Sequence, residues 1–181
     1  MPFSMDTFPE LHTARLRLRK ISIDDVPLLI RYANNKKIAD YILNIPHPYG
    51  EPDAVFRIGY VVQGFKNRSR YVFAIVLKER DELIGEISLH LSDDRRRAQL
   101  GYWVGEPFWN TGIATEAVAA ILPFGFDILN LLEVQATCHA ENRASWKVLE
   151  HNGMVQRLAT GSILQYSFTG QEYKTRTAGE D

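Results

Sequence analysis

The sequence predicts one α/β domain of the α+β type, in which a central, mostly antiparallel mixed sheet is flanked by helices. Three features predict it: a strand-like alternation near the N-terminus, three β-rich runs joined by short polar turns, and helical and strand-like segments that alternate after residue 112. No repeat, low-complexity block or flexible linker divides the chain. We therefore expect a single domain over residues 1–181, with flexible ends at 1–12 and 175–181.

The N-terminal part is predicted to form a strand followed by helices. The run ARLRLRK, Ala14 to Lys20, alternates leucine with arginine, which is the period of a half-buried strand with its arginines in solvent. The runs DDVPLLIRYANN and DAVFRIGYVVQGFK show helical spacing, and Asp24 and Asp53 stand where a carboxylate caps a helix or interacts favourably with its dipole. The proline-rich stretch NIPHPYGEP between them is typical of a loop.

The middle of the chain is predicted to form an antiparallel meander. The runs RYVFAIVLK, ELIGEISLHL and AQLGYWVG are rich in residues that favour strands, and the polar stretches ERD and SDDRRRA separate them. Because such short connections join neighbouring antiparallel strands, we expect the three runs to pair in order.

Beyond Gly112 the pattern alternates between helix and strand. Apolar or small residues recur at helical spacing at Ala114, Ala117, Val118, Ile121, Leu122, Gly125 and Leu129. Pro123 is expected to kink or end this helix, because proline lacks a backbone N–H. EVQATCHA then predicts a strand, and ENRASWKVLEHNG predicts a short helix with Asn142 as its N-cap and Gly153 as its stop. MVQRLA and ILQYSFTG predict two closing strands.

Composition excludes several classes of function. A formal net charge of -1 provides no overall attraction to nucleic acid or to an acidic membrane, so we expect neither as a partner. The single cysteine, Cys138, excludes an internal disulfide framework and alternates with Val134 and Ala136 as a core thiol does. The five histidines lack metal-ligand spacing, so no metal is expected. No signal-peptide pattern or membrane-spanning apolar run is present, which favours the cytoplasm.

The stretch FWNTGIATEA, Phe108 to Ala117, places a small-residue turn between a predicted strand and a predicted helix. Such a turn presents unpaired backbone N–H groups, and the helix dipole adds positive potential, so phosphate is its natural ligand. The Gly-Lys-Ser/Thr of a nucleotide-triphosphate loop is missing, and only Gly112 and the small Ala114 match a dinucleotide fingerprint. The turn therefore indicates an anion site of another kind.

Two blocks carry a family resemblance. GYWVGEPFWNTGIATEAVAAILPFGFDILNL, followed by ENRASWKVLEHNGM, closely resembles the GNAT family of acetyl-CoA-dependent N-acetyltransferases, and in particular the RimJ/RimL-type branch that acetylates protein N-termini. The resemblance runs from LHTARLRLRKISIDD through QYSFTGQEYK. It implies the GNAT fold, acetyl-CoA as co-substrate, and direct attack by a primary amine in a ternary complex.

The resemblance also implies which residues bind the cofactor. The family motif Gln/Arg-x-x-Gly-x-Gly/Ala falls on the turn, whose amides would hold the pyrophosphate of coenzyme A. The residues concerned are Trp109, Asn110, Thr111, Gly112, Ile113, Ala114 and Thr115. Trp109 departs from the usual Gln or Arg, which leaves the backbone amides as the contacts there. The strand segment Tyr102, Trp103 and Val104 matches the one that pairs with the pantetheine arm and aims an N–H at the thioester oxygen, as an oxyanion donor does.

Asn142 and Ser145 match the Asn-x-x-Ser of this branch. The resemblance implies that Asn142 contacts the cofactor arm and that Ser145 protonates or hydrogen-bonds the departing thiolate. From the residues alone, Asn142 is simply a helix cap and Ser145 a surface residue near the helix start.

The general base is the least defined part of the site. Relatives often carry a Glu on the strand before the phosphate turn, where this chain has Gln99, and an amide does not accept a proton usefully near neutral pH. Glu86 and His90 share a parity on the neighbouring predicted strand and reach the same side of the sheet, which makes Glu86 the candidate catalytic carboxylate. The competing interpretations are a solvated carboxylate and a surface histidine.

The expected acceptor is a protein N-terminal α-amine of the ribosomal-protein type. An α-amine has a pKa of ~7.8 and a lysine amine ~10.4, so near neutral pH the α-amine is roughly several-hundred-fold richer in its nucleophilic form and suits an enzyme with a weak base. The alternatives are a small amine, such as a polyamine or an aminoglycoside, and a non-catalytic acyl-CoA sensor, which Trp109 and Gln99 would suit. We expect the segment from Asp24 to Asn67 and the last strands to build the acceptor pocket. The chain is expected to be a monomer, or a homodimer paired through its C-terminal strands.

Overall fold

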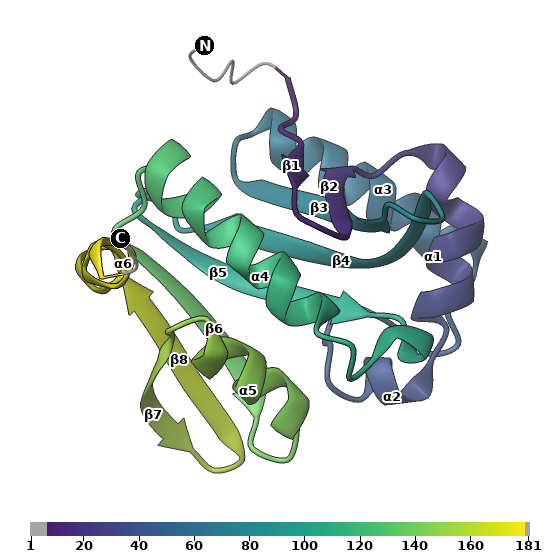
Figure 1. The fold of residues 1–181 in the computed structure, drawn as a ribbon. Helices are drawn as coiled ribbons and strands as arrows, with labels where there is room; N and C mark the ends of the chain where they lie inside the picture. Colours follow the sequence, from purple (N-terminus) through teal and green to yellow (C-terminus); the bar gives the residue numbers. More distant parts are fainter. Residues whose placement is uncertain (1–6, 180–181) are drawn as a thin grey trace.

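The computed structural model describes residues 7–179 and forms one eight-stranded sheet with helices on both faces (Figure 1). The sheet order is β1-β2-β3-β4-β5-β6-β8-β7, and every neighbouring pair is antiparallel except β5 and β6, which are parallel. The strands are β1 (Leu11–His12), β2 (Leu16–Lys20), β3 (Arg70–Leu77), β4 (Glu82–Leu91), β5 (Arg97–Val104), β6 (Glu133–His139), β7 (Val155–Thr160) and β8 (Ile163–Thr169). The predicted fold class and the antiparallel meander of β3, β4 and β5 are confirmed.

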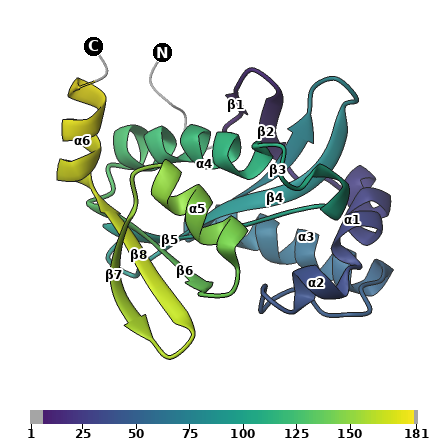
Figure 2. The ribbon, with the colours of Figure 1, turned by 60° about the horizontal axis from the view of Figure 1, so that its bottom comes forward.

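The helices cover the two faces of the sheet unequally. They are η1 (Ile23–Asp25), α1 (Val26–Ala33), α2 (Lys36–Ala39), α3 (Glu51–Lys66), η2 (Glu106–Phe108), α4 (Ile113–Pro123), η3 (Phe124–Ile128), α5 (Arg143–His151) and α6 (Gly170–Ala178). Helices α4 and α5 lie side by side on one face, whereas α3 packs on β3 from the other (Figures 1 and 2). Alternate residues of β4 and β5 therefore face either α3 or the α4–α5 pair.

The leucines of β2 are fully buried, as the alternation predicts, but its arginines are more than a solvated face. Leu16 and Leu18 are 0% exposed. Arg15 pairs with Glu116 of α4, Arg17 with Asp81 and Arg19 with Asp25. This side of the strand is therefore a row of ion pairs that tie β2 to its neighbours.

Of the two predicted capping carboxylates, Asp53 caps its helix and Asp24 does not. Asp53 accepts a hydrogen bond from Gly50 N–H at 2.9 Å and so caps α3, as predicted. At the first helix the neighbouring Asp25 does this work, since its carboxylate accepts from Ser22 N–H at 2.8 Å, while Asp24 is exposed. Helix α2 was not predicted because its four residues are about one helical turn, too short for periodicity to show.

Pro123 ends α4 as an α-helix, but the helical path continues. The next five residues form the π-helical turn η3, which closes with a bond from Leu129 N–H to Phe124 O at 3.0 Å. Proline supplies no N–H, so a change of hydrogen-bond spacing at this point is the expected result.

The chain ends carry more structure than the sequence predicts. Leu11–His12 pair with β2, and α6 follows β8 directly, closed at its start by reciprocal bonds between Thr169 and Glu172. This capping box was readable from the sequence as Thr-x-x-Glu. The predicted flexible ends include residues 1–6 and 180–181, which lie outside the described part of the chain. Between residues 7 and 179, no helix combines the length and the apolar character needed to cross a membrane.

Candidate functional site

The parallel pair β5 and β6 opens into a wedge. Only Arg97–Glu133, Ala98–Val134 and Gln99–Gln135 are in register, and beyond Gln99 the two strands diverge (Figure 1). Strand β6 continues its pairing with β8 along its whole length, whereas the rest of β5 keeps only β4. Half of β5 is thus left with one free edge, which faces the opening.

The free edge presents backbone donors to the wedge. Opposed residues of antiparallel strands alternate between exchanging both backbone bonds and exchanging neither. The bond from Gly105 N–H to Ile84 O at 2.7 Å fixes this alternation, so Trp103 bonds to β4 while Tyr102 and Val104 turn their N–H and C=O groups away from it. The Val104 carbonyl accordingly accepts from the Trp109 indole at 2.6 Å. The N–H groups of Tyr102 and Val104 are therefore available to a chain that enters the wedge.

The turn after β5 has the geometry of an anion site. Asn110 and Gly112 have positive φ angles of 58° and 80°, and Gly112 is the N-cap of α4. Its carbonyl accepts from Glu116 N–H at 3.0 Å, which leaves the N–H groups of Ile113 and the two residues after it without an acceptor inside the helix. These donors and the positive end of the helix dipole converge at the mouth of the wedge.

Arg15, which directly precedes β2, holds this turn. Its Nη1 donates to Thr111 O at 2.8 Å, and its Nε donates to Glu116 Oε2 at 2.7 Å. Burial opposes ionisation of Glu116, but hydrogen bonds from Thr13 and Arg15 outweigh it and lower the pKa of that carboxyl. The arrangement fixes the Thr111 carbonyl toward Arg15. The sequence placed Arg15 on a solvated face, and no local pattern indicated this contact.

The other wall of the wedge is the start of α5. The Asn142 side chain accepts from Ser145 N–H at 3.2 Å, which confirms Asn142 as the N-cap. The Tyr102 hydroxyl lies 2.9 Å from Ser145 Oγ and 3.0 Å from Ser145 O. A cavity of ≈ 60 Å³ lies here, lined by residues of β5, β6 and α5 that include Gly101, Thr137 and Cys138. The structure thus brings Tyr102, Asn142 and Ser145 together at the opening between the strands.

Tyr102 and Cys138 are held neutral at this wall. Burial raises the pKa of the Tyr102 phenol, and the Ser145 hydrogen bond only partly offsets the effect. Burial likewise raises the pKa of the Cys138 thiol, which is 8% exposed, in keeping with the predicted core thiol. The wall therefore offers hydroxyl and thiol protons without charge near neutral pH.

Glu86 lies on the opposite face of the sheet, toward α3. It is 3% exposed, so it is not a solvated carboxylate. Its Oε2 accepts from Arg57 Nη2 at 2.8 Å, from Arg57 Nε at 3.1 Å and from the Trp103 indole at 3.1 Å. Its Oε1 has only a 3.4 Å contact with Arg57 Nε. One oxygen of this carboxylate is therefore saturated and the other is not.

His90 and Gln99 complete this face. His90 shares the α3 side with Glu86, as their parity predicts, and burial together with Arg57 and Arg70 lowers its pKa to about 4. Its imidazole is consequently neutral near pH 7. Gln99 pairs with His90 on one side and with Gln135 on the other, so it stands where β5 and β6 separate. Tyr102 and Trp103 are consecutive residues of β5, which places Ser145 and Glu86 on opposite sides of the sheet with the wedge between them.

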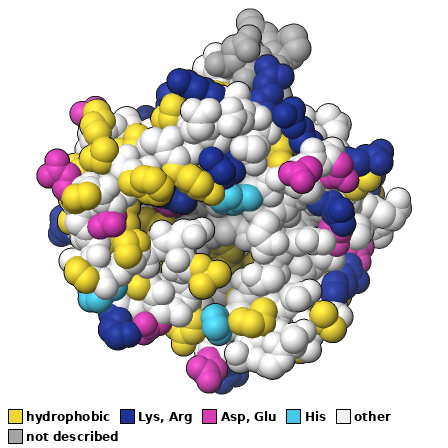
Figure 3. Space-filling view, turned by 180° about the vertical axis from the view of Figure 1, so that it is seen from behind, with side chains coloured by type: hydrophobic (Ala, Val, Ile, Leu, Met, Phe, Trp, Pro, Cys, Tyr) yellow, Lys and Arg dark blue, Asp and Glu magenta, His cyan; other side chains and the backbone are white. Residues whose placement is uncertain are grey.

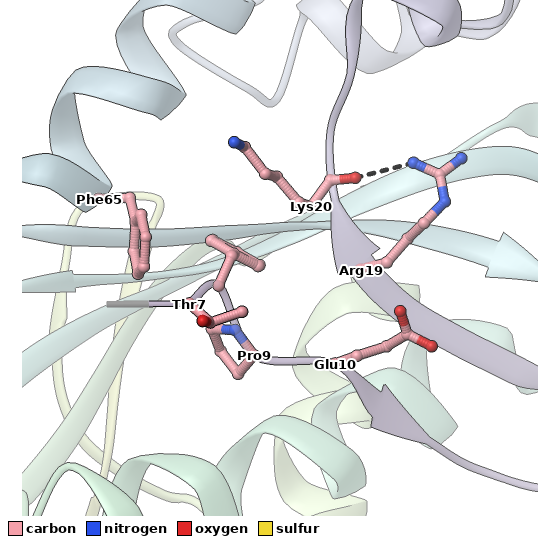
Figure 4. Close-up of a pocket in the computed structure, with 7 residues that line it drawn as sticks. Thr7, Pro9, Glu10, Arg19, Lys20 and Phe65 are labelled. Carbon is pink, nitrogen blue, oxygen red and sulfur yellow. Dashed lines mark hydrogen bonds between the residues drawn. The ribbon is translucent and has the colours of Figure 1, made fainter. Parts of the chain in front are cut away.

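A larger surface groove lies elsewhere and lacks this chemistry. It has a volume of ≈ 380 Å³ and is lined by Thr7, Phe8, Pro9, Glu10, Arg19, Lys20 and Phe65 (Figure 4). In Figure 4 the Arg19 guanidinium points to the Lys20 carbonyl, and Arg19 also pairs with Asp25, so both of its terminal nitrogens already have partners. Among residues 7–179 no group of three His, Cys, Asp or Glu side chains is placed to hold a metal ion. The wedge is the candidate site.

Comparisons with known proteins place this geometry in a family. A model described as an acetyltransferase (GNAT) domain matches residues 15–155. A curated protein of Bacillus licheniformis, the uncharacterized N-acetyltransferase p20, is 34% identical over 145 residues, which cover 77% of this chain and 78% of the relative.

Solved structures share the fold at lower identity. RimJ of Mycobacterium smegmatis in complex with CoA-disulfide has a TM-score of 0.80 and 20% identity, covering 95% of each chain. The spermidine N-acetyltransferase of Vibrio cholerae in complex with CoA and spermine has a TM-score of 0.74 and 19% identity, covering 90% of this chain and 99% of that one. At these identities the likeness concerns the fold.

Proposed function

The chain belongs to the GNAT family of acetyltransferases and is an acetyl-CoA-dependent N-acetyltransferase, and we propose that its acceptor is the α-amine of a protein N-terminus. The observation that carries the proposal is the wedge between β5 and β6, because it joins an anion-binding turn, free strand N–H donors and the Ser145 hydroxyl in one opening. The structural likeness to a RimJ protein supports this choice of acceptor class.

Cofactor binding is assigned to the turn and to the edge of β5. The backbone amides of Asn110, Thr111, Gly112, Ile113, Ala114 and Thr115 bind the pyrophosphate. The positive φ of Gly112 and the unpaired first turn of α4 fit that role. The Trp109 indole is bonded to the Val104 carbonyl, so its side chain forms part of the wall, and its backbone joins the turn.

The pantetheine arm is assigned to the free edge of β5. The backbone groups of Tyr102 and Val104 face the opening, and we assign the Val104 N–H as the oxyanion donor to the thioester oxygen. Trp103 turns its backbone toward β4 and lines the site through its side chain, which holds Glu86. The Asn142 amide oxygen is used as the helix cap, which leaves the amide NH₂ as the group that contacts the arm.

Ser145 and Glu86 are assigned the proton chemistry from opposite sides of the wedge. The amine attacks the thioester carbon, and Ser145 donates a hydrogen bond to the departing sulfur. Glu86 accepts the amine proton through Oε1, its less occupied oxygen. The buried carboxylates among the described residues are Asp25 and Glu86, and Asp25 is bound on both oxygens by Arg19. Glu86 is thus the carboxylate with an oxygen to spare.

The electrostatics of the α3 face favour an α-amine over a polycation. Burial, followed by the charges of Arg57 and Arg70, lowers the pKa of His90, and the positive potential of the two arginines disfavours a polyamine and favours the neutral form of an amine. Helix α3 also carries exposed apolar side chains, including Phe56 at 75% and Val55 at 46% exposure. Figure 3 shows apolar side chains gathered around a hollow on this side. An extended N-terminal peptide suits such a surface better than a small, highly charged amine.

The second candidate is a small-amine acceptor, which the likeness to the spermidine N-acetyltransferase supports. The deciding experiment measures free thiol released from acetyl-CoA by the purified protein. The acceptors are peptides with varied free N-termini, lysine peptides with blocked N-termini, and polyamines. Turnover restricted to free N-termini is expected. Turnover only with small amines would identify a small amine, not a protein N-terminus, as the acceptor. Acetyl-CoA binding without turnover on any of the tested acceptors would favour a sensor. The cytoplasm is the proposed compartment, since it supplies both acetyl-CoA and new N-termini.

A further inference from the structure

The Tyr102 phenol occupies an unusual position at the wedge. Strand alternation turns its side chain toward α5, and its hydroxyl meets two oxygens of the same residue, Ser145 Oγ at 2.9 Å and Ser145 O at 3.0 Å. A phenol has one proton to donate. Which of the two oxygens receives it decides where the Ser145 hydroxyl proton points.

The backbone carbonyl of Ser145 does not depend on the phenol. Leu149 stands four residues later in the same α-helix, so its N–H is the regular partner of that carbonyl. The carbonyl is therefore satisfied without the phenol, and in the Tyr102–Oγ contact, where either oxygen can donate, the phenol is able to donate to Ser145 Oγ. When Oγ accepts from Tyr102, the Ser145 hydroxyl keeps its own proton for a third group.

The cavity beside Ser145 is also lined by a sulfur atom. The Cys138 thiol lines the same cavity as Ser145, on the side of β6, and Ser145 partly offsets the burial that raises the pKa of this thiol. The Ser145 hydroxyl thus shares this cavity with a phenol and a thiol. Burial keeps Tyr102 protonated, so the phenol remains a donor while charge develops nearby.

We propose that Tyr102 is a positioning residue for thiol release, in which its phenol donates to Ser145 Oγ and so directs the Ser145 hydroxyl at the sulfur of the acyl donor. This inference rests on the proposed role of the wedge. The amine nitrogen forms a bond to the thioester carbon, and the C–S bond breaks with its electron pair on sulfur. Ser145 hydrogen-bonds that thiolate, Tyr102 keeps its proton, and the proton lost by the amine goes to Glu86.

The first test compares Tyr102→Phe with Tyr166→Phe, which removes a buried phenol that bonds Glu150 on the outer side of α5. Losing one hydrogen bond to a group that carries developing charge is expected to lower kcat about 10- to 100-fold in Tyr102→Phe. The Tyr166→Phe control should keep kcat within about 2-fold. In a Ser145→Ala background, Tyr102→Phe should cost nothing more, because the phenol acts through the serine. Equal, additive losses in both backgrounds would overturn the proposal.

The second test requires no turnover. It follows the thiol pKa of bound coenzyme A by the ultraviolet absorbance of its thiolate. Desulfo-coenzyme A serves as the blank, since Tyr41, Cys138 and His139 line this cavity, Glu150 and Tyr166 interact electrostatically with Cys138, and the ionisation of some of these groups also absorbs. A donor aimed at sulfur lowers the thiol pKa, so Tyr102→Phe and Ser145→Ala should each raise it by roughly one unit, and Tyr166→Phe should not.

The two tests separate this inference from the proposed function. A thiol pKa that depends on Tyr102, without acetylation of any amine, supports the positioning role and rejects the proposed function. If the protein acetylates an amine but Tyr102→Phe changes neither the thiol pKa nor kcat, the proposed function is supported and the positioning role of Tyr102 is rejected. Failure of the wild-type protein to bind coenzyme A would overturn both.

Discussion

At the scale of single residues, the site depends on hydrogen bonds that assign one task to each polar atom. Asn142 uses its oxygen to cap α5 and thereby orders the backbone of Ser145. Glu86 uses Oε2 to hold Arg57 and Trp103, which leaves Oε1. A site in which each polar group has one hydrogen-bonding position left is pre-organised, because little reorientation is needed when a substrate enters.

Ser145→Ala is expected to lower kcat about 10- to 100-fold and to leave the acetyl-CoA Kd nearly unchanged, since the hydroxyl is needed only as the sulfur departs. Steady-state kinetics and calorimetric binding measure the two effects. Ser167→Ala provides a matched control, because Ser167 is a buried serine of β8 whose hydroxyl bonds Arg157. A weaker Kd with unchanged kcat in Ser145→Ala would remove Ser145 from thiol release.

Glu86→Gln is expected to lower kcat/KM about 100-fold through loss of the base. It also leaves the buried Arg57 without its counter-charge, at a cost of about 1–3 kcal/mol in the free energy of unfolding. Denaturant unfolding separates the two effects. Arg57→Gln should show the stability loss with a smaller loss of turnover. If both variants lose activity in proportion to stability, Glu86 is structural.

At the scale of elements, Arg15, which directly precedes β2, ties the N-terminal segment to the turn before α4. Its side chain binds both the Thr111 carbonyl of the turn and Glu116 in the first turn of α4. The N-terminal segment thus holds the turn with its amides directed outward. An anion site made of backbone groups is only as precise as the backbone that carries it.

Arg15→Ala is expected to raise the KM for acetyl-CoA about 3- to 10-fold with little change in kcat, because loosening the turn weakens pyrophosphate binding and leaves the thioester contacts in place. Arg17→Ala is the matched control, since Arg17 lies two residues further along the chain, in β2, and pairs with Asp81 away from the turn. An equal effect of the two substitutions in initial-rate measurements would refute a specific role for Arg15.

At the scale of the whole molecule, the sheet separates two chemistries. The α4–α5 face carries the turn, Tyr102 and Ser145, and the α3 face carries Glu86, Arg57 and His90. The wedge is the opening through which the two faces meet. In the proposed function, the cofactor binds on the α4–α5 side and the acceptor approaches from the α3 side.

The α3 face should also make folding sensitive to acid. The folded-state pKa of His90 is about 4, below its ordinary value of 6.5. Between these two pH values the folded protein therefore binds fewer protons than the unfolded chain. Its contribution is fully present above pH ~6.5 and is lost as the pH falls toward ~4, by roughly 1–3 kcal/mol. His90→Gln should flatten that part of the stability profile in chemical unfolding at several pH values. An unchanged profile would show that His90 does not control acid stability.

The outer edge of the sheet bears on the predicted oligomeric state. Every residue of β7 is exposed, and Val155 and Leu158 are 43% and 52% exposed. An exposed edge of this kind is able to pair with another strand. Whether the chain is a monomer or a homodimer stays a prediction, and light scattering on the purified protein measures it directly.

The sequence by itself determined the elements and the local parts of the site. Periodicity located the meander and the helices, the caps at Asp53 and Asn142 are contacts within three residues, and the small residues around Gly112 revealed the turn. Such features are readable because their partners are neighbours in the chain. Where local pattern was too short, as in α2, or was overlooked, as in the Thr169 capping box, an element was missed.

Only the tertiary structure decided which distant residues meet. Arg15 and Thr111 are 96 positions apart, Tyr102 and Ser145 are 43 apart, and Arg57 and Glu86 are 29 apart. The wedge itself exists because β5 and β6 pair over only three residues while β6 follows β8. These contacts depend on how the sheet is ordered and where two strands diverge. The spacing of residues in the sequence encodes neither the strand order nor the point of divergence, since both result from packing the whole chain around one core.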